Sequence, residues 1–209
     1  MGVTTPGAWG VLGGTFDPVH FAHLAIAEQS REDLGLAGVL FVPAGIPPHK
    51  PTGLITPAAH RVAMVALAIA GNACFSLSRI EVDRPGVSYA VDTLEQLAGE
   101  YPDLVFILSV EALRGLPTWR QPARILELCR MAVVPRHGYR SPGRAWLAEH
   151  VPGQEDRGLF LDGPDLGNSA SDIRRRAASG RSIRYLVPEA VADYIARHRL
   201  YPPELWTKN

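Results

Sequence analysis

The segment covering residues 9–34 constrains the fold more strongly than any other part of the chain. An apolar run at 9–12 is followed by Gly13 and Gly14, and then by an amphipathic stretch at 24–34. This order predicts a strand, a tight glycine turn and a helix, whose first N–H groups and positive dipole end form a seat for phosphate. His20 and His23 share one face of the first helical turn. We therefore expect a nucleotide site at which chemistry takes place.

Beyond this unit, strand-like apolar runs alternate with helical patterns. We expect strands at 9–12, 39–42, 75–82, 104–108, 131–134 and 160–161, and helices at 19–34, 57–70, 88–97, 122–128, 171–178 and 188–197. Thr56 is the expected N-cap of the second helix, with Pro57 as its first residue. The chain after Arg136 is expected to be loose, because glycine and proline punctuate it. The alternation predicts an α/β fold with a doubly wound, mostly parallel sheet, ligands at the carboxyl ends of its strands, and a helical C-terminal portion.

The length of 209 residues suits a single domain, with 1–8 as a loose lead-in and 165–209 as the C-terminal helical part. The 21 basic and 21 acidic residues balance, so bulk charge predicts neither a nucleic-acid nor a membrane partner. The longest apolar run, 62–70, is too short to span a bilayer, and residues 1–8 lack the features of a signal peptide. Cys74 and Cys129 lack metal-site spacing and are typical of a reducing cytoplasm. An oligomer is compatible with these features.

The His20–His23 turn admits two other interpretations. It could be a plain strand-to-helix turn, or the two histidines could bind a metal ion. A metal site would need a third ligand, and no further cluster of His, Cys or carboxylate residues offers one. The turn also lacks the Gly-Lys-Ser/Thr of a Walker A loop and the dinucleotide fingerprint.

Three further segments carry polar or aromatic groups suited to a nucleotide. Residues 168–174 (Asn-Ser-Ala-Ser-Asp-Ile-Arg) offer hydroxyls, a helix N-terminus and a guanidinium that can grip phosphate, although a serine-capped surface helix is the simpler interpretation. Residues 47–50 (Pro-Pro-His-Lys) place Lys50 in a loop after the second strand, where a lysine is usually a solvated surface charge. Residues 116–120 (Leu-Pro-Thr-Trp-Arg) place Trp119 in another loop, where tryptophan usually packs at the core or its rim.

The run Gly-Gly-Thr-Phe-Asp-Pro-Val-His-x-x-His closely resembles the signature of the nucleotidylyltransferase superfamily. Within it, the chain resembles the bacterial nicotinate-nucleotide adenylyltransferases from about residue 10 to 201. The resemblance implies a Rossmann-like nucleotidylyltransferase fold and adenylyl transfer from ATP to nicotinate mononucleotide, giving deamido-NAD and pyrophosphate in NAD biosynthesis. It implies catalytic roles for His20, His23, Lys50 and Arg174. The ATP-binding residues that it implies are Gly13, Gly14, Thr15, Phe16, Asp17, His20, His23, Ser169, Ser171 and Arg174.

The same resemblance implies a mononucleotide site in which Trp119 stacks on the pyridine ring and the amide of Arg120 meets the nicotinate carboxylate. The residues implied at this site are Lys50, Ser88, Tyr89, Ala90, Val91, Glu111, Trp119 and Arg120. Mg²⁺ is expected to bridge phosphate oxygens, with few or no direct protein ligands. The chain departs from the family pattern at several positions: Ala90 replaces threonine, Ser109-Val110-Glu111 replaces Gly-x-Asp, and Asn168, Ala170 and Ser171 replace isoleucine, serine and threonine.

Other functions remain as alternatives. A phosphopantetheine adenylyltransferase, a cytidylyltransferase for a phosphorylated alcohol, and a catalytically weak nucleotide sensor would share the first motif. The loop around Trp119 and the chain length favour the pyridine nucleotide, and the departures motivate the sensor. A phosphate nucleophile is already anionic, so the expected catalysis consists of alignment and electrostatic stabilisation.

Overall fold

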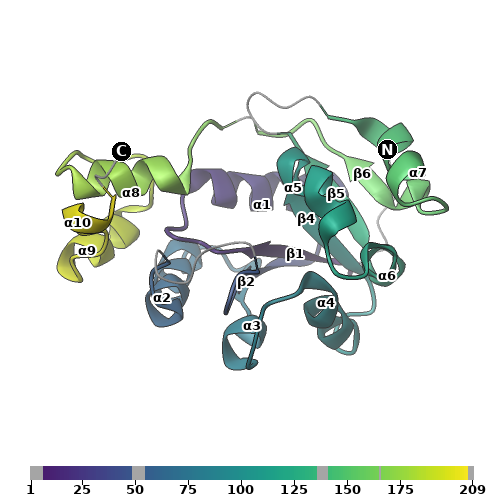
Figure 1. Ribbon diagram of the computed structural model, residues 1–209, viewed down its shortest axis with the longest axis horizontal. Coiled ribbons are helices and arrows are strands. Elements are labelled where there is room, and N and C mark those ends of the chain that lie inside the picture. The colour runs from purple at the N-terminus through teal and green to yellow at the C-terminus, as the bar shows by residue number, and fades with distance from the viewer. Residues whose placement is uncertain (1–6, 49–54, 136–140, 165, 207–209) are drawn as a thin grey trace.

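The computed structural model of the chain describes residues 7–48, 55–135, 141–164 and 166–206. Strands and helices alternate along most of this length (Figure 1). The strands are β1 Trp9–Gly14, β2 Gly38–Pro43, β3 Phe75–Leu77, β4 Leu104–Ser109, β5 Arg130–Val134 and β6 Gly158–Phe160. The helices are α1 Phe21–Leu34, α2 Ala58–Ile69, α3 Ile80–Asp83, α4 Ala90–Ala98, α5 Val110–Gly115, α6 Pro122–Leu128, α7 Gly143–His150, α8 Ala170–Ala178, α9 Glu189–Arg197 and α10 Pro203–Trp206.

The strands form one parallel sheet in the order β3-β2-β1-β4-β5-β6. β1 is central, and its Val11 is paired with Leu40 on one side and Phe106 on the other. The chain runs outward from β1 to β3, then returns to add β4 on the opposite side. This order confirms the doubly wound α/β fold predicted from the sequence, and it creates a switch point between β1 and β4.

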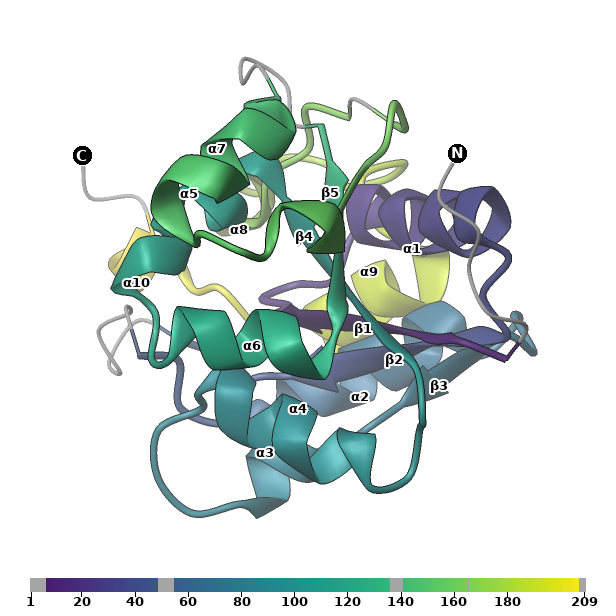
Figure 2. The same ribbon diagram turned by 90° about the vertical axis from the view of Figure 1, so that its right-hand side faces the viewer.

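Two hydrophobic clusters cover the two faces of the sheet, because neighbouring strand residues point to opposite faces. Leu12, Phe41 and Val105 pack with residues of α1, α2, α8 and α9. On the other face, Leu40 and Phe106 pack with residues of α4, α5, α6 and α7. Figure 2 shows α4 and α6 next to each other on that side, and Figure 1 shows α8, α9 and α10 gathered at the C-terminal end. No helix in the described ranges has both the length and the apolar character needed to cross a bilayer.

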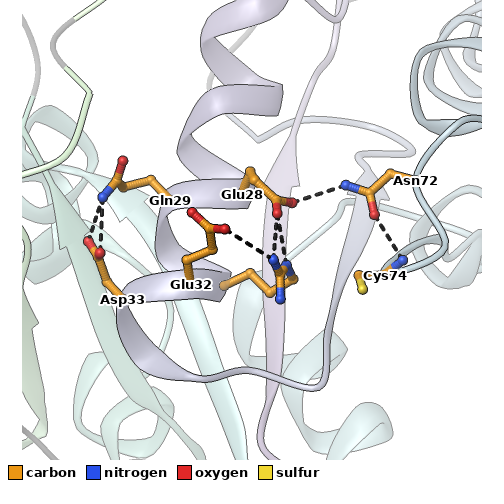
Figure 3. A network of polar contacts seen from close by, with 7 residues as sticks. Glu28, Gln29, Glu32, Asp33, Asn72 and Cys74 are labelled. Carbon is orange, nitrogen blue, oxygen red and sulfur yellow. Dashed lines mark hydrogen bonds and ion pairs between the residues drawn. The ribbon is translucent and has the colours of Figure 1, made fainter.

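A polar network fixes the outer part of α1 (Figure 3). The Glu28 carboxylate accepts hydrogen bonds from Arg31, at 2.6 Å, and from Asn72, at 3.0 Å, which lies before β3. These hydrogen bonds, that of Arg31 first, lower the pKa of Glu28. The helix ends at Gly35, whose φ of 60° is the left-handed conformation that favours glycine. The cap and the network together hold the C-terminal half of α1. Its N-terminal end therefore has a defined position beside the sheet.

Some element predictions were wrong. The alternation at 75–82 predicted one strand, but only Phe75–Leu77 is extended and Ile80–Asp83 is a short helix that turns Glu81 inward. The N-cap of α2 is Pro57 rather than Thr56. The stretch after residue 136, expected to be loose, contains α7. The short helices α5 and α10 were also not predicted.

Candidate active site

A cavity of about 460 Å³ opens at the carboxyl ends of β1, β2, β4 and β5. The last residues of these strands line it together with the first turns of α1, α4 and α8. Ligands of doubly wound folds bind at the point where the strand order reverses, which here is the crevice between β1 and β4. The cavity therefore lies where the topology alone places a ligand.

His20 and His23 lie at the N-terminus of α1, and both line the cavity. Their rings are stacked, with centroids 3.7 Å apart. The backbone N–H of His20 donates to Nδ1 of His23 at 3.2 Å. Because a backbone N–H only donates, Nδ1 of His23 is the acceptor, and the neutral ring carries its proton on Nε2. The structure thus places two imidazoles together at a positive helix end, which is an arrangement suited to an anion.

Aromatic packing shapes the turn that precedes α1. Phe16 has a φ of 51°, and its buried ring contacts Phe41 at a centroid distance of 5.9 Å. A Cβ atom added to Gly14 would lie 3.1 Å from the Phe16 ring, so the close packing favours glycine there. Gly13, Gly14 and Thr15 line the cavity, as their predicted role in ATP binding requires. Phe16 contributes by holding the turn in place.

Asp17 joins three segments of the chain. Its Oδ1 accepts a hydrogen bond from the Tyr201 hydroxyl at 2.9 Å, and its Oδ2 accepts one from the Thr56 backbone at 3.1 Å. Its carbonyl oxygen accepts one from Nη1 of Arg174 at 2.6 Å. The ATP contact predicted for Asp17 stays a prediction. Since both carboxylate oxygens have protein partners, the structure gives this side chain a positioning role.

Asn168, Ser169 and Ala170, at the start of α8, line the same cavity. Ser169 is the N-cap, and its Oγ accepts a hydrogen bond from the backbone of Asp172 at 3.1 Å. One turn further, Nη2 of Arg174 donates to Oγ of Ser171 at 3.0 Å. Burial lowers the pKa of Arg174, and the nearby Asp17 opposes this effect. Ser171 and Arg174 are not among the residues that line the cavity.

Trp119, Arg120, Tyr89 and Ala90 form another wall of the cavity. The Trp119 ring lies edge-on to Phe106, with centroids 6.1 Å apart. The Arg120 guanidinium stands 5.1 Å above the Tyr89 ring and pairs with the Asp92 carboxylate at 3.4 Å. The structure therefore brings together the aromatic and cationic groups predicted for the mononucleotide, although segments about 30 residues apart in sequence supply them.

A buried carboxylate, that of Glu81, was missed by sequence reasoning. It lines the cavity and accepts a hydrogen bond from Oγ1 of Thr93 at 2.8 Å. Burial raises its pKa, while hydrogen bonds from Thr93 and Ser88 act in the opposite direction. The Ser88 hydroxyl also accepts a hydrogen bond from the Gly45 backbone at 2.9 Å. Glu81 thus ties the start of α4 to the chain after β2. The sequence did not predict this role, because a charged residue in an alternating stretch does not by itself indicate burial.

Some predicted residues lie elsewhere. The Val91 side chain is buried in the core among Leu94 and Leu97, so it does not reach the cavity. Glu111 is exposed in the first turn of α5 and does not line the cavity either. Lys50 lies outside the described residues, and its predicted role stays a prediction.

An apolar wall was also not predicted. It consists of the cavity-lining residues Ile26, Val134, Pro135, Pro164 and Leu166. The end of β5 could have been expected there from topology, but the residues around 164–166 carry no motif.

Within the ranges that the structure describes, no group of three or more His, Cys, Asp or Glu residues could hold a metal ion.

Comparison with known proteins adds independent information. The cytidylyltransferase-like family matches residues 11–176. A protein of Thermomicrobium roseum named "probable nicotinate-nucleotide adenylyltransferase" is 50% identical over 194 residues, which cover 92% of this chain and 90% of that protein. A protein of the same name from a Roseiflexus species is 48% identical over 92% of this chain and 96% of its own length.

Solved structures resemble the fold. The nicotinic acid mononucleotide adenylyltransferase of Plasmodium falciparum, complexed with NaAD, matches with a TM-score of 0.78 at 17% identity, covering 93% of this chain and 97% of that chain. The same enzyme complexed with APC matches with a TM-score of 0.76 at 16% identity, with the same coverage. At this level of identity, the likeness concerns the fold.

Proposed function

The chain belongs to the nicotinate-nucleotide adenylyltransferase family, and from this premise we propose that it transfers the adenylyl group of ATP to nicotinate mononucleotide. A phosphate oxygen of the mononucleotide forms a bond to the α-phosphorus of ATP. The bond from that phosphorus to the bridging oxygen breaks, and pyrophosphate leaves. The product is deamido-NAD, an intermediate of NAD biosynthesis. The observation that carries the proposal is that one cavity holds the His20–His23 pair, the first turn of α8 and the Trp119 wall.

The reacting centre lies at the start of α1. The nucleophile is already anionic, so the reaction needs alignment and charge stabilisation rather than a general base. His20 and His23 donate hydrogen bonds to α-phosphate oxygens, whose negative charge grows during the transfer. The backbone around Gly13, Gly14 and Thr15 allows the phosphates to approach closely, and the α1 dipole adds positive potential.

The leaving pyrophosphate is assigned to the start of α8. Ser169 caps that helix and lines the cavity, Ser171 lies in the same first turn, and Arg174 lies one turn further along. The Arg174 guanidinium has five N–H donors and uses two of them on Asp17 and Ser171, so a second N–H on each terminal nitrogen can bind phosphate oxygen. Lys50 completes this role in our assignment.

The pyridine ring is assigned to the wall formed by Trp119, Tyr89 and Ala90. Trp119 offers a flat face for stacking. The nicotinate carboxylate meets the Arg120 amide and the start of α4, and the Arg120 guanidinium adds charge complementarity. The apolar wall that includes Ile26 and Val134 is then left for the adenine ring.

Mg²⁺ is the metal that the family implies. The donor set fits an ion carried by the triphosphate, because the Asp17 carboxylate is engaged by Tyr201 and Thr56 and no three-ligand cluster exists among the described residues. When bound, the ion neutralises phosphate charge. His20, Arg174 and the two helix N-termini would orient the phosphates that carry the ion.

Pyrophosphate release, measured with ATP, Mg²⁺ and each candidate acceptor, tests the proposal. We expect turnover with nicotinate mononucleotide to exceed that with nicotinamide mononucleotide or phosphopantetheine. His20→Ala should lower kcat by about two orders of magnitude, with circular dichroism unchanged. His150→Ala, a change on α7, which contributes no residue to the cavity lining, is the matched control. Near wild-type turnover in His20→Ala would refute the catalytic role. Tight ATP binding without turnover of any acceptor would favour a sensor.

A further inference from the structure

The C-terminal segment folds back onto the phosphate end of the site. Trp206, at the end of α10, places its ring 4.1 Å from the central carbon of the Arg174 guanidinium. Helix α10 packs against α8, as Figure 1 shows at the C-terminal end of the molecule. The family match ends at residue 176, so Trp206 lies outside the region that the family defines. A residue beyond the recognised motifs thus contacts the guanidinium assigned to pyrophosphate.

A closed ring of contacts surrounds this guanidinium. Arg174 donates to the Asp17 carbonyl at 2.6 Å, and the Asp17 carboxylate accepts from Tyr201 at 2.9 Å. Tyr201 is 3% exposed and meets the Trp206 ring edge-on at 6.1 Å. Burial raises the pKa of the Tyr201 hydroxyl, so it remains a donor at neutral pH. Each member of the ring is held by two others.

The hydrogen-bond donors of Arg174 are aimed in fixed directions, so phosphate binding depends on the orientation of its guanidinium. Nη1 and Nη2 are directed at Asp17 and Ser171, while Nε is buried without a hydrogen-bond partner among the described residues. An arginine side chain has many rotamers, and ordering it on ligand binding costs affinity. A ring stacked on the guanidinium limits that freedom in advance, and a cation over an aromatic face is itself attractive.

We propose that Trp206 is a positioning residue for ATP: by stacking on Arg174, it holds the guanidinium in the orientation that binds the leaving pyrophosphate. The proposal rests on the proposed function, in which Arg174 binds phosphate. It makes the segment 201–206 part of the ATP site although the segment does not line the cavity. The mononucleotide wall is formed by α4 and the loop before α6, far from α10 in Figure 1, so Trp206 should affect one substrate and not the other.

Steady-state kinetics of pyrophosphate release separate these effects. Trp206→Ala should raise the KM for ATP roughly threefold to tenfold, the range expected from loss of a stacked cation. The KM for nicotinate mononucleotide should stay within about twofold. Trp206→Phe, which keeps an aromatic face, should restore most of the ATP affinity. Trp206→Leu keeps apolar bulk without an aromatic face, so it should raise the KM for ATP as Trp206→Ala does. It also preserves packing, so it tests the same point if the alanine variant disturbs the fold.

The double variant tests whether Trp206 acts through Arg174. In an Arg174→Ala background, Trp206→Ala should add no further increase in the KM for ATP. Trp146→Ala is the matched control, because Trp146 stacks on His150 on α7, away from the site. Additive effects of the two changes, an equal rise in both KM values, or Trp206→Leu equal to wild type would each overturn the proposal.

Calorimetric titration with MgATP and with pyrophosphate keeps the two hypotheses distinguishable. Wild type that binds MgATP but releases no pyrophosphate with nicotinate mononucleotide would defeat the proposed function. The positioning role would still stand if Trp206→Ala and Trp206→Leu weakened binding of MgATP and pyrophosphate while Trp206→Phe did not. Unchanged dissociation constants in all three variants would defeat the positioning role, whatever the reaction is.

Discussion

Arg61 provides the sharpest test of how the site is held. It lies on α2 with 1% of its surface exposed. Its guanidinium donates to three backbone carbonyls, those of Thr15 at 2.8 Å, Thr56 at 2.9 Å and Gly45 at 3.1 Å. These carbonyls belong to the turn after β1, the chain before α2 and the chain after β2. Burial lowers the pKa of Arg61, and Asp17 is the first of the charges that oppose this effect.

The perturbation is Arg61→Met, which keeps most of the aliphatic volume and removes every donor. Each carbonyl left buried without a partner costs about 1–3 kcal/mol. Three such carbonyls together would cost about 3–9 kcal/mol, and relief of burying a charge offsets part of this cost, which leaves about 3–5 kcal/mol. We expect a loss in that range. For a chain of this size, it corresponds to a fall in Tm of roughly 6–20 °C.

Urea unfolding followed by circular dichroism measures the loss, and Arg124→Met is the control. Arg124 is exposed and pairs with Glu95 at 3.1 Å and Glu127 at 3.0 Å. Exposed ion pairs are worth little, so we expect this control to lose less than about 1 kcal/mol. If Arg61→Met lost no more than the control, hydrogen bonds to the three carbonyls could not be what joins these segments.

Three other predictions concern the substrate wall and two buried acids. Trp119→Ala should raise the KM for nicotinate mononucleotide about tenfold, because a stacked ring is worth about 1–3 kcal/mol; a larger effect on the KM for ATP would contradict the assignment. Burial raises the pKa of the Cys129 thiol to about 12, so iodoacetamide should modify it only in urea, as mass spectrometry would reveal. Burial also raises the pKa of Glu81, so the stability gained from its protonated form is present below about pH 4.3 and is lost as the pH rises through the raised value. Wild-type urea midpoints should therefore fall relative to Glu81→Gln between about pH 4 and 8, and a constant difference would argue against this.

The sheet was predictable because its strands are buried on both faces. Residues such as Val39, Leu40 and Phe41 form continuous apolar runs, which are typical of parallel strands between two helical layers. The 75–82 prediction was wrong because β3 is an edge strand paired only with β2 along residues 39–41. Beyond that pairing, the chain turns into α3. Alternation in sequence does not reveal where a neighbouring strand ends.

The site was predictable where motifs carry it and not where burial does. The sequence placed His20, His23 and Ser169 at strand and helix ends, and the topology gathers those ends into one cavity. The sequence did not predict the buried polar residues Arg61, Glu81 and Tyr201. A charged or polar residue in a helical or alternating pattern normally indicates a solvated position. Which charge is buried depends on contacts between segments distant along the chain, and no local pattern encodes them.

The departure at Ser109 now has a physical explanation. Serine replaces a family glycine at the end of β4, and its φ of −78° is ordinary for a residue with a side chain. Its Oγ accepts a hydrogen bond from the Ala112 backbone at 3.2 Å, so the serine is the N-cap of α5. Glu111 then lies in the first turn of that helix, where the helix dipole favours an acidic side chain. The substituted residues are locally consistent with one another, so this departure stabilises a helix at the cavity rim and is not a sign that the site has decayed.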